Sequence, residues 1–107
     1  MELWELAARE RIKDTLAKYN WSGDAARLDE LAQAFCEDGE LELRGSNTVR
    51  GRAAIVEMLG GVVAAPSTTA QASSVKRIVR HNVTNVRFTE VGPAEVRVAC
   101  YLSLIHI

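Results

Sequence analysis

The fold is decided by a stretch between residues 16 and 39, which contains LAKYNWSGD at 16–24, LDEL at 28–31 and FCEDG at 35–39. An apolar stripe with helical spacing predicts a helix over residues 2–20, and this stripe consists of Ala8, Ile12, Leu16 and Tyr19. The WSGD segment is expected to break this helix, with Asp24 as the N-cap of a second helix. The apolar face of the second helix consists of Leu28, Leu31, Ala32 and Phe35.

The rest of the chain alternates between strand and helix signals. Residues 40–44 (ELELR) have the period of two of a half-buried strand, and Gly45 begins a turn. A third helix is expected over residues 52–59 with Gly60 past its end, followed by a flexible loop over 61–74. Two strands are expected over 75–89 and from 95 onward, joined at Gly92 and Pro93. Helices ahead of an antiparallel sheet predict an α+β fold, in which the helices cover one concave face of the sheet.

Bulk properties exclude several classes of partner. The 107 residues form one domain, and 13 basic and 14 acidic side chains are interspersed with a net charge of −1. Neither nucleic acid nor an anionic membrane is therefore an expected partner. No segment is apolar enough to span a bilayer and the N-terminus is acidic, which predicts a cytoplasmic protein. Cys36 and Cys100 are isolated, which predicts buried reduced thiols, and the motifs predict neither a cofactor nor a metal.

Together with GR at 51–52 and RHNVTNV at 80–86, the motifs quoted above resemble the SnoaL-like group. That group belongs to the superfamily of nuclear transport factor 2, the ketosteroid isomerases and scytalone dehydratase. The resemblance extends from about residue 10 to residue 101 and depends on the order and spacing of the motifs. It implies a cone-shaped fold in which three helices from the N-terminal half pack on a curved antiparallel sheet around an apolar pocket. It also implies a homodimer for the full-length protein.

The same resemblance leads us to expect that the final strands are missing. Members of the group continue through a further pair of long strands, whereas three strands are predicted here. The last six residues, LSLIHI at 102–107, can be encoded by the end sequence of a common transposon-type sequencing adapter. We therefore expect an incomplete SnoaL-like domain over residues 1–101 and a non-native tail over 102–107. The alternative is a short natural strand that ends in hydrophobic residues.

His81 is the first candidate for acid–base chemistry. It is the only histidine outside the final six residues, and a neutral imidazole could act as a general base or acid near about pH 7. The alternative is a strand histidine that bonds a neighbour or lies on the outer face of the sheet. A period of two groups His81 with Val83 and Asn85 but places Val86 and Phe88 on the other face. The pattern therefore leaves open which face of this strand is buried, and a bulge could be present.

Asp24 and Tyr19 gain candidate catalytic roles from the resemblance. Asp24 matches the aspartate that scytalone dehydratase holds at the pocket mouth to orient a base, although a helix N-cap alone would explain it. Tyr19 matches the tyrosine of the ketosteroid isomerase oxyanion hole, and its alternative is a helix-core aromatic. Leu43 stands where those isomerases carry their catalytic aspartate, which disfavours steroid isomerisation.

The pocket is expected to be lined by large apolar residues and one amide: Trp21, Phe35, Met58, Tyr101 and Asn85. The expected ligand is a small, mostly apolar or polyketide-like molecule. If the domain is an enzyme, we expect cofactor-free isomerisation, dehydration or cyclisation with His81 and Asp24 as the acid–base pair. The alternative is a non-catalytic ligand-binding or dimerisation module of the same fold. The two hypotheses differ in whether His81 and Asp24 meet in one cavity.

Overall fold

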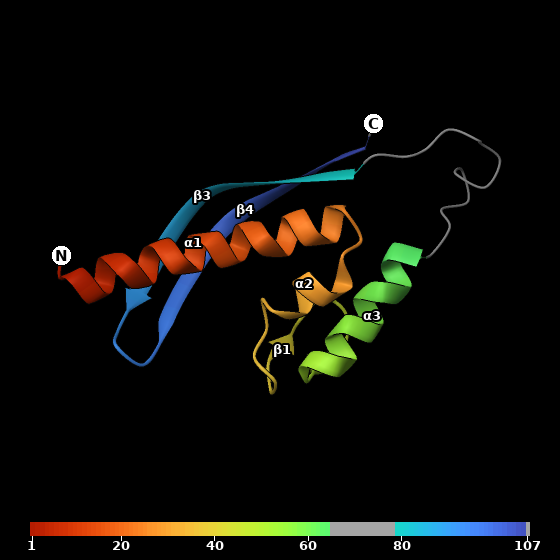
Figure 1. The fold of residues 1–107 in the computed structure, drawn as a ribbon, viewed down its shortest axis with the longest axis horizontal. Coiled ribbons are helices and arrows are strands. Elements are labelled where there is room, and N and C mark those ends of the chain that lie inside the picture. Colours follow the sequence, from red (N-terminus) through yellow and green to blue (C-terminus); the bar gives the residue numbers. More distant parts are fainter. Residues whose placement is uncertain (65–78, 107) are drawn as a thin grey trace.

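The structure is a computed structural model that describes residues 1–64 and 79–106. Along the chain, its elements are α1 (Leu3–Asp24), α2 (Leu28–Ala32), β1 (Glu40–Leu41), β2 (Val49–Arg50), α3 (Arg52–Ala64), β3 (Val79–Val91) and β4 (Val96–His106). Helix α1 lies between the long β3–β4 ribbon and the α2–α3 pair (Figure 1). The predicted α+β class is confirmed. Within the described residues, however, the strands form two separate antiparallel pairs, β1–β2 and β3–β4, rather than one sheet.

Helix α1 follows the predicted apolar stripe but ends later than predicted. The stripe residues are partly buried, while Glu10 and Asp14 on the opposite face are exposed. The helix continues through the WSGD segment to Asp24, so the predicted break is wrong. The reason is that the turn comes at Ala26, whose φ of 59° lets the Arg27 N–H bond the Ser22 carbonyl at 2.8 Å.

The N-cap predicted for Asp24 is also wrong. Helix α2 has Arg27 at its N-cap, and no side chain caps it. Asp24 is instead the last residue of α1. Its carboxylate is therefore free to bond a residue far along the chain, which places it in the candidate site.

The apolar core lies where α2 meets α3. Among the described residues, Leu31 (3% exposed) and Ile55 (0%) are the buried hydrophobic side chains. Gly51 has a φ of +88°, and its N–H bonds the Gly39 carbonyl at 2.7 Å. The Arg52 side chain donates two bonds to the Phe35 carbonyl, at 2.6 and 2.8 Å. These bonds tie the start of α3 to the segment that follows α2.

Two predicted element ends differ from the structure. Helix α3 continues through Gly60 to Ala64, so Gly60 does not end it. A Cβ at Gly60 would lie 3.1 Å from Leu28, so glycine allows a close approach of α2 and α3 there. Most of the loop predicted over 61–74 lies outside the described residues. The strand predicted over 40–44 is only the pair Glu40–Leu41, which bonds Val49–Arg50 as a hairpin that the sequence did not predict.

Strand β3 contains a bulge, a possibility that the sequence pattern had not decided. Val79, His81 and Val83 are partly buried, while Arg80 and Asn82 between them are exposed. The register with β4 shifts between Thr84 and Arg87, where Asn85 has a φ of 53°. After this shift, Val86 and Phe88 are the partly buried residues. Because of the bulge, the partly buried residues before it and those after it lie on the same side of β3, the side that α1 covers.

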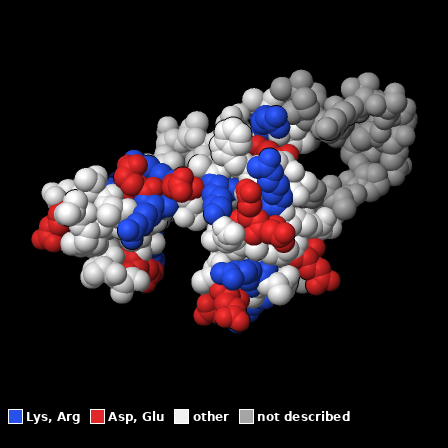
Figure 2. All heavy atoms as spheres, viewed as in Figure 1, with Lys and Arg blue, Asp and Glu red and all other residues white. Residues whose placement is uncertain are grey.

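The surface differs from the prediction at both cysteines. Cys36 and Cys100 are free thiols but exposed, so their predicted burial is wrong. Cys36 follows α2 in a loop, and Cys100 lies on β4, which α1 covers less than it covers β3. Basic and acidic side chains are interspersed on the face shown in Figure 2, as the sequence predicts. No helix of the described residues is long and apolar enough to cross a membrane.

Candidate functional site

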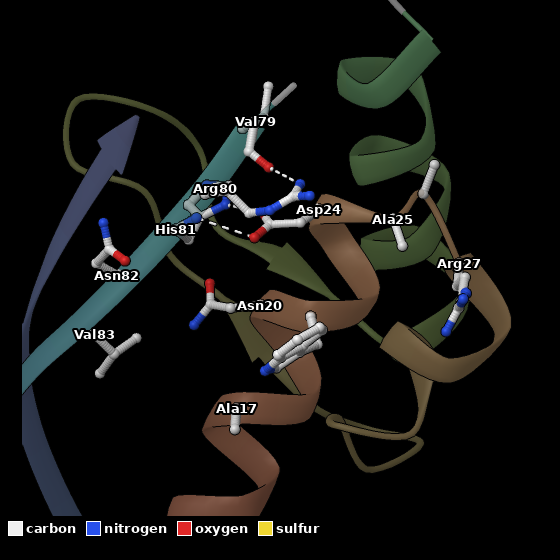
Figure 3. Close-up of a pocket in the computed structure, with 12 residues that line it drawn as sticks. Ala17, Asn20, Asp24, Ala25, Arg27, Val79, Arg80, His81, Asn82 and Val83 are labelled. Atoms are coloured by element: carbon white, nitrogen blue, oxygen red, sulfur yellow. Dashed lines mark hydrogen bonds and ion pairs between the residues drawn. The ribbon is translucent and has the colours of Figure 1, made fainter. Parts of the chain in front are cut away.

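A pocket of about 920 Å³ opens between the C-terminal part of α1 and the beginning of β3 (Figure 3). Helix α1 and the turn after it contribute one wall, and consecutive residues of β3 contribute the other. The lining residues are Ala17, Asn20, Trp21, Asp24, Ala25, Ala26, Arg27, Val79, Arg80, His81, Asn82 and Val83. Half of them are apolar, so the wall combines apolar surface with polar and charged groups.

The helical wall is set by the spacing of α1. Ala17, Asn20 and Asp24 are separated by three and four residues, which puts them on one face of the helix. Ala17 leaves room at this face because its side chain is a methyl group. The two polar residues that follow are directed toward β3 (Figure 3). The later end of α1, beyond the predicted break, is what brings Asp24 to this face.

Asp24 binds two groups of one residue, His81. Its Oδ2 accepts a hydrogen bond from the His81 backbone N–H at 3.0 Å, and its Oδ1 contacts the His81 ring nitrogen Nδ1. A carboxylate only accepts hydrogen bonds, so Nδ1 carries the hydrogen in this pair. In a neutral imidazole, this leaves the lone pair on Nε2. The backbone bond fixes the strand against the helix, and the ring contact fixes the orientation of the imidazole.

The electrostatic environment of Asp24 favours a hydrogen-bond donor such as His81 beside its carboxylate. The carbonyl end of a helix carries a partial negative charge, so an acidic residue at this end is unfavourable by itself. The Asp24 side chain is 11% exposed and the His81 side chain 30%, so solvent compensates the carboxylate only in part. Hydrogen bonds from His81 satisfy both carboxylate oxygens, which stabilises the charge where α1 ends.

Comparison with known proteins shows which family this chain belongs to. Residues 4–107 match the family described as the SnoaL-like domain. The chain belongs to this family. No curated protein matches significantly.

Solved structures share the fold of this SnoaL-like domain. A Novosphingobium aromaticivorans protein assigned as an aromatic ring hydroxylase is similar with a TM-score of 0.78 and 22% identity, over 95% of this chain and 66% of that one. A second protein of that organism, assigned as a scytalone dehydratase, has a TM-score of 0.74 and 23% identity over 94% and 61%. ActVI-ORFA of Streptomyces coelicolor has a TM-score of 0.74 and 15% identity over 94% and 70%. The SnoaL-like domain thus spans less than two thirds of the first two chains.

Of the predicted site residues, the SnoaL-like domain brings His81, Asp24 and Trp21 to the pocket. Tyr19 lies elsewhere on α1, where its ring packs edge-on against Phe35 with centroids 5.7 Å apart. Burial raises the pKa of the Tyr19 hydroxyl above its usual value of 10.0, because desolvation disfavours the phenolate. Tyr19 therefore packs as a helix-core aromatic residue, which was the alternative to its catalytic role, and it does not line the pocket with His81.

The other predicted lining residues, Phe35, Met58, Asn85 and Tyr101, are not among the residues that line this pocket. Asn85 occupies the left-handed position of the β3 bulge, a conformation that asparagine tolerates better than most residues. Tyr101 lies opposite Thr84 on β4 and is 67% exposed. The position of Asn85 thus follows from the bulge, and the position of Tyr101 follows from its place on the exposed part of β4.

Sequence reasoning missed four polar residues of the pocket, which are Asn20, Arg27, Arg80 and Asn82. Asn20 is 9% exposed and lies one turn before Asp24. Arg80 lies beside His81, and its guanidinium donates to the Val79 carbonyl at 2.8 Å. The spacing of Asn20 and Asp24 could have revealed the first. In the described ranges, no three His, Cys, Asp or Glu side chains gather closely enough to hold a metal ion.

Proposed function

We propose that this SnoaL-like domain binds a small, mostly apolar or polyketide-like molecule between α1 and β3 and performs cofactor-free acid–base chemistry on it. The observation that carries the proposal is the bond of Asp24 to both the backbone and the ring of His81 at the pocket wall. An imidazole oriented by a carboxylate is one of the arrangements that serve general-base catalysis.

The chemistry follows from the ring. With its hydrogen held on Nδ1, His81 can take a proton on Nε2 from a carbon next to a ligand carbonyl. This step gives an enolate and an imidazolium, and the imidazolium is stabilised by the Asp24 carboxylate. If the imidazolium first exchanges its proton with solvent, reprotonation of the same carbon gives isotope exchange. Reprotonation of another carbon gives isomerisation. If the enolate instead expels a β-hydroxide, which takes the proton from the imidazolium and leaves as water, the result is dehydration. All three outcomes share the first proton transfer.

Proton exchange tests this shared step without knowledge of the natural substrate. We expect the protein to accelerate the exchange of deuterium into 2-tetralone, a bicyclic ketone, in deuterated buffer, as measured by NMR. His81→Gln should lower this rate by about 10² or more, because the general base is removed. Asp24→Asn should lower it as well, because the imidazole loses its orienting carboxylate.

Arg87→Gln is the matched control, because Arg87 is exposed on β3 beyond the pocket and should leave the rate unchanged. Equal exchange rates for the wild type and His81→Gln would refute the catalytic proposal. If 2-tetralone binds without any accelerated exchange, the second candidate, a non-catalytic ligand-binding module, becomes the better description. The apolar half of the pocket lining is compatible with that second candidate.

A further inference from the structure

Asn20 is a buried polar side chain whose role the His81–Asp24 pair does not explain. It is 9% exposed, and it lies on the same face of α1 as Asp24, one turn earlier. Burial of an amide is costly unless its polar atoms find partners. Leucine or alanine would fill a helix position of this kind without that cost. Asn20 also lines the pocket, so its amide places a polar group on the pocket wall.

The hydrogen bonds of Asn20 account for only one side of the amide. Its Nδ2 donates to the Leu16 carbonyl at 3.2 Å, within α1. Its carbonyl oxygen Oδ1 is directed toward β3, on the side where His81 and Arg80 lie (Figure 3). No donor in the described part of the chain bonds this oxygen. An acceptor thus faces the pocket beside the candidate base.

We infer that Asn20 is a specificity-determining residue, whose Oδ1 accepts a hydrogen bond from a hydroxyl group of the ligand. This inference rests on the proposed function, because it concerns a ligand of the same pocket. It narrows the ligand to a mostly apolar molecule that carries a phenolic, enolic or alcoholic hydroxyl. Because Asn20 and His81 line the same pocket, a hydroxyl bound by Asn20 would position the ligand relative to the base.

Other residues of the pocket lining restrict the chemical class of the ligand's hydrogen-bond donor further. Ala17 and Val83 provide apolar surface near Asn20, which suits a ring or a hydrocarbon chain. Arg27 and Arg80 also line the pocket, and neither forms an ion pair with a described carboxylate. These two guanidinium groups outnumber the single carboxylate of Asp24 in the lining, which disfavours an ammonium ion as the donor. A neutral hydroxyl fits both the amide oxygen and these charges.

A matched pair of ligands tests the inference on the complete 107-residue chain. The probes are 2-naphthol, which donates a hydrogen bond, and 2-methoxynaphthalene, which cannot donate one. Binding is measured by calorimetry, and the Asn20 side-chain amide is followed by NMR. We expect the wild type to prefer 2-naphthol by roughly three- to tenfold, the range for one neutral hydrogen bond. We expect Asn20→Leu to bind both probes alike while it keeps its affinity for the methyl ether.

Two further variants secure the result. Asn20→Ala tests the same loss without added volume, in case leucine prevents folding, and circular dichroism verifies the fold of each variant. Gln33→Leu is the matched control, because it removes an exposed amide outside the pocket and should keep the preference.

The outcomes separate this inference from the proposed function. A wild type that binds both probes equally, or variants of Asn20 that keep the preference, would overturn the role of Asn20 and leave the pocket proposal standing. A protein that binds neither probe would overturn the pocket proposal and this inference with it. Loss of the preference in both Asn20 variants but not in Gln33→Leu would support the inference.

Discussion

Asp24 and His81 are 57 residues apart in the chain, yet the carboxylate bonds both the backbone and the ring of the histidine. An aspartate that precedes an amphipathic run is typical of a helix N-cap, which is why the local sequence predicts a cap. The structure assigns it a long-range partner instead, because α1 continues to Asp24 and the chain turns only at Ala26. Local spacing could nominate His81 and Asp24 separately, but it could not reveal that they bond.

Asn20 shows the same limit at the scale of a single residue. A helical wheel places it on one face with Ala17 and Asp24, so its position was available from the sequence. What was not available is the opposite wall of the pocket, which β3 supplies more than fifty residues later. The polar character of Asn20 therefore resembled ordinary helix surface, although the residue is 9% exposed.

The pH dependence of stability is expected to report on Tyr19. Its pKa is raised by burial above 10.0, so the unfolded state loses its proton before the folded state does as the pH rises. The contribution of the neutral phenol to stability is thus fully present below about pH 10 and is lost as the pH rises through the folded-state pKa. Tyr19→Phe removes this titration. Urea unfolding at about pH 8 and about pH 11 should show a larger loss of stability for the wild type than for Tyr19→Phe.

Tyr101 provides the control for Tyr19, because it is 67% exposed. The Tyr101→Phe variant should lose as much stability between these two pH values as the wild type does. If Tyr19→Phe loses as much stability between the two pH values as the wild type does, the hydroxyl of Tyr19 is not desolvated in the folded protein.

At the scale of the elements, two glycines are expected to respond in opposite directions to alanine. Gly23 lies inside α1, and an added Cβ would sit 3.5 Å from Leu31, an ordinary contact. Gly23→Ala should stabilise the protein by about 0.5–1 kcal/mol, because alanine is the better helix former. Gly51 has a φ of +88°, and Gly51→Ala should destabilise it by about 1–2 kcal/mol. Urea unfolding of both variants measures the two changes.

This pair also tests where α1 ends. If residues 21–24 broke the helix, as the sequence predicted, Gly23 would serve the break and Gly23→Ala would destabilise the protein. A destabilised Gly23→Ala would therefore contradict the continuous helix. Gly51→Ala supplies the internal comparison, since added Cβ atoms meet little at Gly51 and only its backbone conformation is strained.

Element types were predictable in this chain to a larger extent than element boundaries. The stripes that define α1, α2 and α3, and the turn at Gly92, arise from local spacing, and the structure confirms them. The β1–β2 hairpin escaped prediction because β2 has only two residues, too few for a period to be recognised. The orientation of β3 escaped it because the bulge at Asn85 reverses the parity of the residues that follow, and a second register shift between Phe88 and Glu90 reverses it again.

At the scale of the whole molecule, β4 is the element that the described structure leaves least covered. It pairs with β3 along one edge, and no other described strand pairs with its second edge. Its later side chains are apolar and 46–67% exposed: Tyr101, Leu102, Leu104 and Ile105. An edge strand that is long, apolar and free of proline offers its backbone groups to a second strand.

We expect the 107-residue chain to self-associate through this edge, and sedimentation velocity over a concentration series should show its mean mass rising with concentration. Lysine at edge positions disfavours such pairing, so the double variant Ala99→Lys and Tyr101→Lys should sediment mainly as a monomer. Both positions lie before the final six residues, so the test does not depend on the origin of that segment. Ala53→Lys, at an exposed position of α3, is the control for added charge and should associate as the wild type does. A wild type that stays monomeric at every concentration would show that β4 does not pair, and the homodimer that the resemblance implies would then need another surface.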